Sequence, residues 1–158
     1  MLLSGKDRPV TVALADGNPL VLSAMSEIFD RDPRFSLVAT TATAEGFLGA
    51  VIRIPVSVGI IDWNLPALGG HKLIEVLRDQ ANAPRLIVYG DDSRGEVPRQ
   101  AILAGAAGFV ARNTPVDKLL DMASAYRPGL TTVGTVFNPA EDNARLSAEK
   151  LRAICQRR

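Results

Sequence analysis

Two aspartates and one arginine stand where short apolar runs of this sequence end. Asp16 and Asp62 each follow such a run, Arg112 ends a third, and Gly90 ends a fourth. In an open parallel α/β sheet, ligands bind outside the carboxyl ends of the strands, near the point where the strand order reverses. A lone aspartate at a strand end is most often a turn or cap residue. The coincidence of two acids and one base at such positions favours a functional site instead.

The elements that would position these residues alternate regularly. Short runs rich in β-branched residues are followed by longer stretches of helical period, which is typical of βαβ units. We predict strands at residues 10–16, 35–40, 56–62, 85–89 and 108–112, each followed by a helix. The third run is apolar almost throughout, as expected of a central parallel strand buried on both faces.

Capping residues and prolines indicate where several helices begin. Asn18 and Pro19 predict a side-chain cap and a first-turn proline for the first helix. The fourth helix should be short and end near Ala104, because Pro98 must lie in its first turn or break it. Thr114 predicts the cap of the fifth helix.

The composition is that of one ordinary globular domain. Of the 158 residues, 47% are hydrophobic and 22% charged, which excludes disordered, collagen-like and coiled-coil proteins. Lys and Arg total 18 against 17 Asp and Glu, so a net charge of +1 provides no overall field toward nucleic acid or a membrane. One cysteine, Cys155, and one histidine, His71, exclude an internal disulfide framework and most metal clusters. No apolar run suits a signal peptide or a membrane span, so we expect a cytoplasmic protein with no membrane partner.

Four ordered motifs resemble the receiver domains of bacterial two-component response regulators, most closely those of the NarL/FixJ type. The motifs are residues 16–21 (DGNPLV), 61–70 (IDWNLPALGG), 104–109 (AGAAGF) and 114–120 (TPVDKLL). The resemblance covers about residues 8–126, and the second motif is the most specific. It implies a flavodoxin-like (CheY-like), doubly wound five-stranded parallel sheet of order 2-1-3-4-5. A linker at 127–140 and a C-terminal helix at 141–158 would follow this domain.

The resemblance also implies a mechanism and a role for each site residue. In this family an aspartate accepts a phosphoryl group, while Mg²⁺ and a lysine offset the charge on the transferring oxygens. The acceptor would be Asp62, and the metal would be held by Asp16, Asp62 and the backbone carbonyl of Asn64. Arg112 would stand in place of the lysine, and Phe109 would be the switch aromatic residue.

Three positions depart from the family pattern. Gly17 stands where a second acidic residue is expected, Gly90 stands where Thr or Ser is expected, and Arg112 replaces the lysine. Tyr89 has a hydroxyl, but strand alternation points it away from the face of Gly90. Two acids and a guanidinium need no metal, and an ion pair between Arg112 and Asp62 would mimic a locked state. We therefore predict weak or absent Mg²⁺ binding and a conformation that depends little on phosphorylation.

One functional hypothesis is an atypical receiver, or pseudo-receiver, that acts by binding a protein. The partner would be a histidine kinase, another signalling protein or a second copy of the chain. A homodimer would form through the C-terminal helix, or through the face of the fourth helix, fifth strand and fifth helix, whose apolar residues cannot all be core. These residues are Val97, Ile102, Val116, Leu119, Leu120 and Met122.

The alternative is a normally phosphorylated receiver of a NarL/FixJ-type transcription factor. The helix at 141–158 would then begin a truncated or remnant DNA-binding region, and the chain as given should not bind DNA specifically. An enzyme is disfavoured, because no general acid or base is visible beside Asp62 and an acid, Asp16, stands where a phosphate-binding loop would be. At most, the chain would accept a phosphoryl group on Asp62 autocatalytically.

Overall fold

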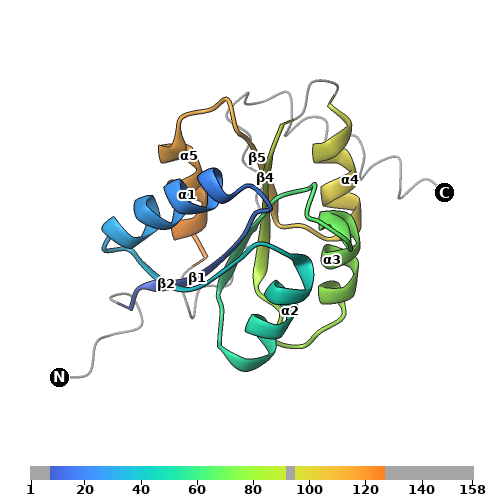
Figure 1. The fold of residues 1–158 in the computed structure, drawn as a ribbon, viewed down its shortest axis with the longest axis horizontal. Helices are drawn as coiled ribbons and strands as arrows, with labels where there is room; N and C mark the ends of the chain where they lie inside the picture. Colours follow the sequence, from blue (N-terminus) through green and yellow to red (C-terminus); the bar gives the residue numbers. More distant parts are fainter. Residues whose placement is uncertain (1–7, 92–94, 127–158) are drawn as a thin grey trace.

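The structure is a computed structural model that describes residues 8–91 and 95–126, in which strands and helices alternate (Figure 1). The strands are β1 (Val10–Ala15), β2 (Phe35–Thr41), β3 (Val58–Ile61), β4 (Arg85–Gly90) and β5 (Gly108–Ala111). The helices are α1 (Pro19–Arg31), α2 (Ala44–Arg53), α3 (Gly69–Arg78), α4 (Glu96–Ala104) and α5 (Val116–Ser124). This confirms the predicted series of five strand–helix units.

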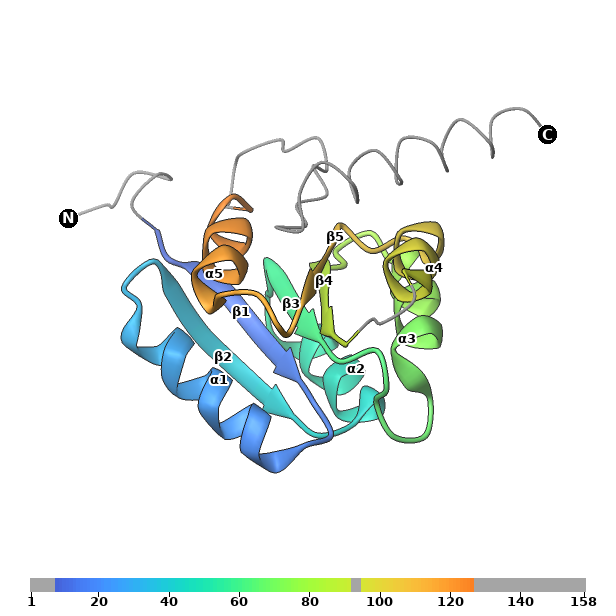
Figure 2. The ribbon, with the colours of Figure 1, turned by 90° about the horizontal axis from the view of Figure 1, so that it is seen from above.

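All five strands form one parallel sheet in the order β2-β1-β3-β4-β5, as predicted (Figure 2). The register of β1 and β3 pairs Ala15 with Ile61. The amide of Asp62 donates to the carbonyl of Ala15 at 2.9 Å, which extends this pairing by one residue. The two residues that follow these strands, Asp16 and Asp62, therefore leave the sheet at the same edge.

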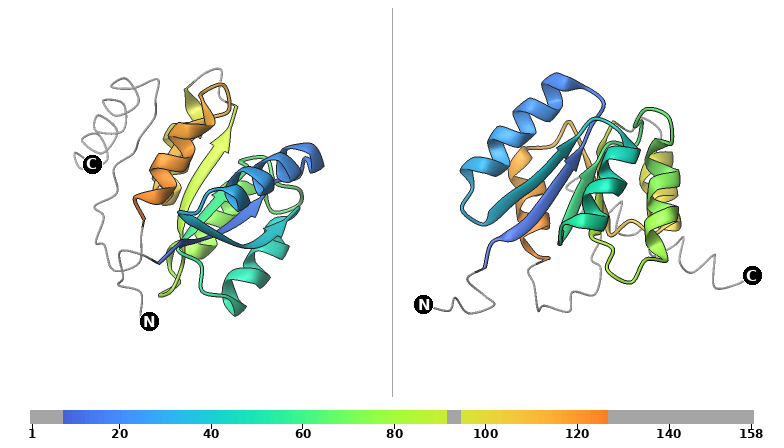
Figure 3. Two further views of the ribbon diagram at one scale, coloured as in Figure 1. Left: turned by 90° about the vertical axis from the view of Figure 1, so that its left-hand side faces the viewer. Right: turned by 60° about the horizontal axis from the view of Figure 1, so that its bottom comes forward.

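Helices cover both faces of the sheet (Figure 3). On the face that we call the α1/α5 face, Phe29 and Leu119 are fully buried with strand residues such as Val12. On the opposite, α2/α3/α4 face, Phe47 and Leu73 are fully buried. Strand side chains alternate between the two faces, so membership of one of these clusters shows to which face a strand residue points.

The predicted starts of two helices are confirmed. The side-chain Oδ1 of Asn18 accepts hydrogen bonds from the amides of Leu20 at 3.0 Å and Val21 at 3.4 Å, at the start of α1. In α4, Pro98 lies in the first turn, where its missing N–H has no carbonyl to bond, and the helix ends at Ala104 as predicted.

Two local predictions are wrong. The third strand was predicted over residues 56–62, whereas β3 covers only Val58–Ile61, although the amides of Ser57 and Asp62 still donate to β1 just outside its two ends. Thr114 does not cap the fifth helix: Pro115 occupies the N-cap position, and the Thr114 hydroxyl donates to the carbonyl of Ala111 at 2.5 Å. The threonine lies one residue too early to reach the free amides of the helix.

The apolar face predicted for self-association is smaller than its sequence indicates. Leu119, Leu120 and Met122 belong to the core, with exposed fractions of 0%, 7% and 6%. Val116, Val97 and Ile102 are half-buried. The second predicted surface, the helix at 141–158, lies outside the described residues together with the linker at 127–140 and Cys155.

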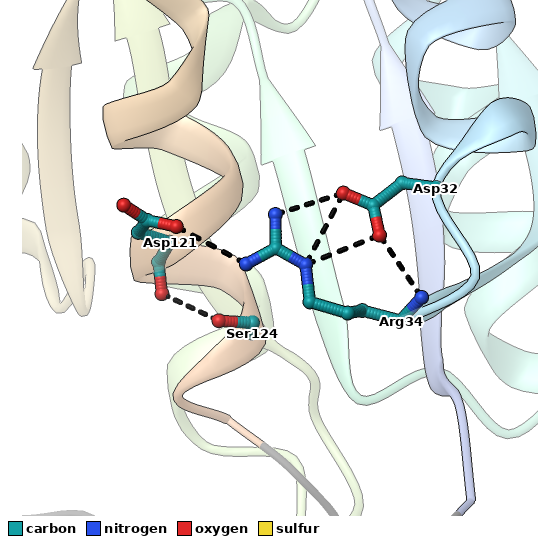
Figure 4. A network of polar contacts seen from close by, with 4 residues as sticks. All are labelled: Asp32, Arg34, Asp121 and Ser124. Carbon is teal, nitrogen blue, oxygen red and sulfur yellow. Dashed lines mark hydrogen bonds and ion pairs between the residues drawn. The ribbon is translucent and has the colours of Figure 1, made fainter.

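A single arginine, Arg34, joins the turn between α1 and β2 to α5 (Figure 4). Arg34 Nη2 lies 2.8 Å from Asp32 Oδ2, and its Nη1 lies 3.1 Å from Asp121 Oδ1. The Arg34 guanidinium also lies 5.4 Å from the centre of the Phe35 ring. These residues lie at the amino end of β2, opposite the edge of the sheet that carries Asp16.

In the part of the chain that the structure describes, no helix is long and apolar enough to span a membrane.

Candidate functional site

Four polar or charged side chains from four neighbouring strands project onto the α1/α5 face at the carboxyl edge of the sheet. Leu14, Ile60, Ile87 and Val110 belong to the core cluster of that face. The residues two positions further along each strand are Asp16, Asp62, Tyr89 and Arg112. The period of two along a strand therefore gives all four the same orientation. Asp16, Asp62 and Tyr89 line one narrow crevice together with Leu22 and Met25 of α1.

Arg112 bridges the two carboxylates, as the sequence predicted for Asp62. Its Nη2 lies 2.6 Å from Asp16 Oδ2, within hydrogen-bond distance, and 3.4 Å from Asp62 Oδ1. The three side chains are 20%, 9% and 14% exposed, in the order Arg112, Asp16 and Asp62. The guanidinium therefore makes its strong contact with Asp16 and a weaker one with the expected phosphoacceptor.

The surroundings of the two aspartates differ. Asp16 is buried, and its Oδ1 accepts from the amide of Asn18 at 2.8 Å while Oδ2 accepts from Arg112. Asp62 Oδ1 accepts from the amide of Asn64 at 3.1 Å and also faces Arg112, whereas Oδ2 makes no hydrogen bond or ion pair with any described residue. Burial raises the pKa of Asp62, with a further upward contribution from Asp16, and the Asn64 amide and Arg112 offset this only in part.

Gly17 leaves the site without a second acid beside Asp16, and the adjacent loop packs closely against it. A Cβ atom placed on Gly17 would lie 2.9 Å from Cδ and 3.1 Å from Cγ of Pro66. Contacts this short would force the proline to move. The loop between β3 and α3 therefore lies so close to position 17 that glycine is the residue that fits there.

Gly90 and Phe109 belong to the opposite side of the sheet. Phe109 is 1% exposed and packs with Val88 in the core of the α2/α3/α4 face, and Gly90 follows Val88 by two residues. A Cβ atom on Gly90 would meet nothing nearer than Trp63 Cβ at 4.0 Å. The position expected to carry a hydroxyl is thus open, and no side chain there links the acidic cluster to Phe109.

The acceptor loop is held by its contacts with the start of α3. The amide of Gly70 donates to the carbonyl of Trp63 at 2.9 Å, and a Cβ on Gly70 would lie 2.7 Å from the carbonyl oxygen of Asp62. Only glycine therefore allows this close approach. The Trp63 ring stacks on the exposed His71 at 5.4 Å, and His71 lies 3.2 Å from Glu75.

Sequence reasoning missed the part played by Tyr89. It set Tyr89 aside because its hydroxyl points away from the face of Gly90, and the structure does place Tyr89 with the α1/α5 core. The Tyr89 ring instead lies beneath the Arg112 guanidinium, with 5.4 Å between Arg112 Cζ and the ring centre. The register pairs Tyr89 with Val110, two residues before Arg112, so the pair lies diagonally on one face. Only that register, which the sequence does not display, brings the two together.

The donor set fits Mg²⁺ poorly. Magnesium requires near-octahedral oxygen ligands, and proteins usually supply them through carboxylates. Here Gly17 supplies no carboxylate, and the guanidinium of Arg112 already contacts the two that are present. Among the described residues, no group of three or more His, Cys, Asp and Glu side chains could hold a metal ion. We therefore derive no chemical step through a metal.

A doubly wound sheet with aspartates after β1 and β3 defines a flavodoxin-like, CheY-like receiver architecture. The family model of the response regulator receiver domain matches residues 12–124, and the chain belongs to this family. "Probable transcriptional regulatory protein SgaR" of Hyphomicrobium methylovorum is 34% identical over 120 residues, which are 76% of this chain and 57% of that protein. The nitrate/nitrite response regulator NarL of Escherichia coli K12 is 20% identical over 131 residues, which are 83% of this chain and 61% of that protein.

Solved structures agree on the fold. The isolated receiver domain of RcsB from Salmonella enterica serovar Typhimurium superposes with a TM-score of 0.72 at 17% identity, covering 91% of this chain and 99% of that one. A structure of two RcsB dimers bound to two parallel DNAs superposes with a TM-score of 0.74 at 17% identity, covering 89% and 69%. The chain spans less than two thirds of the curated relatives described above.

Proposed function

We propose that this chain is an atypical receiver module whose conformation depends little on Mg²⁺-assisted phosphorylation of Asp62. It would act in signal transduction by binding a protein partner or a second copy of itself, and we place it in the cytoplasm. In this proposal Arg112 supplies the positive charge that a metal ion would otherwise bring, and its guanidinium restricts access to Asp62. We call an acceptor in this state guarded.

The position of the Arg112 guanidinium carries this proposal. One nitrogen atom, Nη2, lies 2.6 Å from Asp16 and 3.4 Å from Asp62. A cation in this place offsets the repulsion between the two carboxylates without a metal. Arginine keeps its charge at all physiological pH values and carries its donors on a planar group, so it is not equivalent to the lysine of the family pattern. Gly17 and Gly90 remove two further groups that the family mechanism uses.

One observation favours the alternative, a normally phosphorylated receiver of a NarL/FixJ-type transcription factor. Asp62 Oδ2 makes no hydrogen bond or ion pair with any described residue, so one acceptor oxygen is available for attack on a phosphoryl group. The names of the relatives point the same way, since SgaR and NarL are both regulators. Under this alternative Arg112 would move from Asp62 to the incoming phosphoryl oxygens.

The two proposals differ in their response to a phosphoryl donor. We would titrate the full chain with acetyl phosphate, and separately with beryllofluoride, in the presence of MgCl₂, and follow the fluorescence of Trp63, the only tryptophan of the chain. Intact-mass spectrometry would count covalently bound phosphoryl groups. The proposal predicts no saturable fluorescence change and no stoichiometric phosphorylation.

Two variants serve as controls. Asp62→Asn removes the acceptor and should respond exactly as the wild type does under the proposal. Arg112→Lys restores the family's cation and tests whether the guanidinium itself guards the site, in which case it should gain phosphorylation. A saturable wild-type change that Asp62→Asn abolishes would overturn the proposal and establish the alternative.

A further inference from the structure

The Arg112 side chain crosses the end of one strand to reach its partners. Arg112 follows β5, Asp62 follows β3 and Asp16 follows β1, while β4 lies between β5 and β3. Neighbouring strands are about 4.8 Å apart, so the ends of β5 and β3 are separated by roughly 10 Å, and the Arg112 side chain must cover most of that distance to contact Asp62. A long side chain with several rotatable bonds does not hold such a path without support.

Tyr89 lies on that path. It is the penultimate residue of β4, and its ring centre is 5.4 Å from Arg112 Cζ. The ring also lines the crevice that contains Asp16 and Asp62. A guanidinium over an aromatic face is attracted by the ring quadrupole, and more strongly where water is partly excluded. Burial of Tyr89 raises the pKa of its phenol, so the ring stays neutral at physiological pH.

We propose that Tyr89 is a positioning residue: its ring is the platform that holds Arg112 across β4 and onto the two carboxylates. Tyr89 thereby sets how firmly Asp62 is guarded. That the Tyr89 ring holds Arg112 in place is a geometric statement that stands by itself. Only its consequence, restricted access to Asp62, rests on the proposed function.

The platform has a spectroscopic signature that simple packing lacks. Protons held over an aromatic ring are shifted upfield in the NMR spectrum, so the δ-methylene and Nε–H signals of Arg112 should be upfield in the wild type. Arg112→Lys assigns these signals by removing them. Tyr89→Phe keeps the ring and should keep the shift, whereas Tyr89→Leu keeps an apolar side chain without the ring and should lose it.

The exchange of the Arg112 Nε proton with water gives the size of the effect. In Tyr89→Leu we expect exchange to become about fivefold faster, as the loss of one partly buried cation–π contact implies. Tyr89→Phe should stay within twofold of the wild type.

The outcomes separate this inference from the proposed function. Arg112 signals that are not upfield in the wild type would overturn the platform without either Tyr89 variant, and so even if Tyr89→Leu fails to fold. An upfield shift that survives in Tyr89→Leu would overturn it as well. If the shift and exchange behave as expected but the wild type is phosphorylated stoichiometrically, the platform stands and the proposed function fails.

Discussion

Arg34 and Arg112 each join two aspartates and lie over an aromatic ring, at opposite ends of the same sheet. Each cluster has one positive charge and two negative charges, and each guanidinium lies 5.4 Å from its ring. The effect on the neighbouring carboxylate is opposite. Hydrogen bonds from the Arg34 side chain lower the pKa of Asp32, whereas burial raises the pKa of Asp62. Equal charge counts therefore give opposite electrostatic results.

Burial and the geometry of the contacts together explain the difference, because Asp62 is more deeply buried than Asp32 and receives fewer hydrogen bonds. Arg34 donates to Asp32 through Nε and Nη2, and the Arg34 amide donates to Asp32 Oδ1 at 3.0 Å (Figure 4). Arg112 offers the single atom Nη2 to two carboxylates, of which only Asp16 is within hydrogen-bond distance. Two nitrogen atoms of one guanidinium can saturate a single carboxylate with hydrogen bonds. One nitrogen atom shared between two carboxylates leaves the second with too few hydrogen bonds. Partly buried carboxylates with few hydrogen-bond donors are characteristic of functional sites.

The largest expected effect comes from removing the central cation at the carboxyl edge. Arg112→Ala leaves Asp16 and Asp62 facing each other without a counterion, and we expect a loss of about 3 kcal/mol in the free energy of unfolding at pH 7. Urea unfolding measures this. The matched control, Arg34→Ala, removes a more exposed cation and should cost about 1 kcal/mol. MgCl₂ should recover part of the stability of Arg112→Ala and none of the Arg34→Ala loss; equal losses in both variants would end the comparison.

Asp32→Asn tests the satisfied carboxylate. Because the folded pKa of Asp32 lies below its ordinary value of 3.8, the charged form favours folding, and this contribution is present above pH 3.8 and lost as the pH falls through the folded pKa. We expect the variant to be about 1 kcal/mol less stable than the wild type at pH 7. Denaturation curves between pH 7 and about pH 2 should converge at the acidic end. A difference that persists there would show that shape rather than charge matters.

Asp62→Asn should have the opposite sign. The folded pKa of Asp62 is raised above 3.8, so the folded state holds a proton more firmly than the unfolded state, and the wild type loses stability as the pH rises from 3.8 through the folded pKa. At pH 7 the variant should therefore be more stable by about 0.5 kcal/mol. The gain should vanish at about pH 3. A destabilised variant at neutral pH would mean that Arg112 already satisfies Asp62.

Gly90→Ser should have the smallest effect. A Cβ at this position meets only Trp63 Cβ at 4.0 Å, so the side chain fits, and stability should change by less than about 0.5 kcal/mol. Gly17→Ala is the contrasting variant, because its Cβ would lie 2.9 Å from Pro66 Cδ. It should cost more, about 1 kcal/mol, through overpacking. Thermal unfolding of the pair shows whether the open position and the closed position differ as their contacts indicate.

The sequence predicted the fold well because strand and helix periodicity are local signals. Apolar runs, the cap at Asn18 and the first-turn proline Pro98 depend on neighbouring residues only, and they predicted the element order and most boundaries. The prediction that Arg112 pairs with Asp62 also holds, since strand order alone places both at one edge. The preference of Arg112 for Asp16 does not follow from sequence, because it depends on side-chain paths across β4.

Register and packing explain the remaining differences. The contact of Tyr89 with Arg112 needs the pairing of Tyr89 with Val110, which is set by the whole sheet. The burial of Leu119, Leu120 and Met122 depends on how α5 lies against the sheet, and helical spacing alone left them as surface candidates. The roles of Asp62 and Asn64 in phosphoryl transfer and metal binding stay predictions.

The open position at Gly90 also has a mechanical consequence. The charged cluster acts on the layer of α1 and α5, while Phe109 is embedded in the layer of α2, α3 and α4. A single sheet separates them, and no side chain at Gly90 reaches from the rim to the aromatic ring. We therefore expect a substitution in one layer to disturb the packing of the other layer little, and a partner bound on one layer to respond weakly to changes in the other.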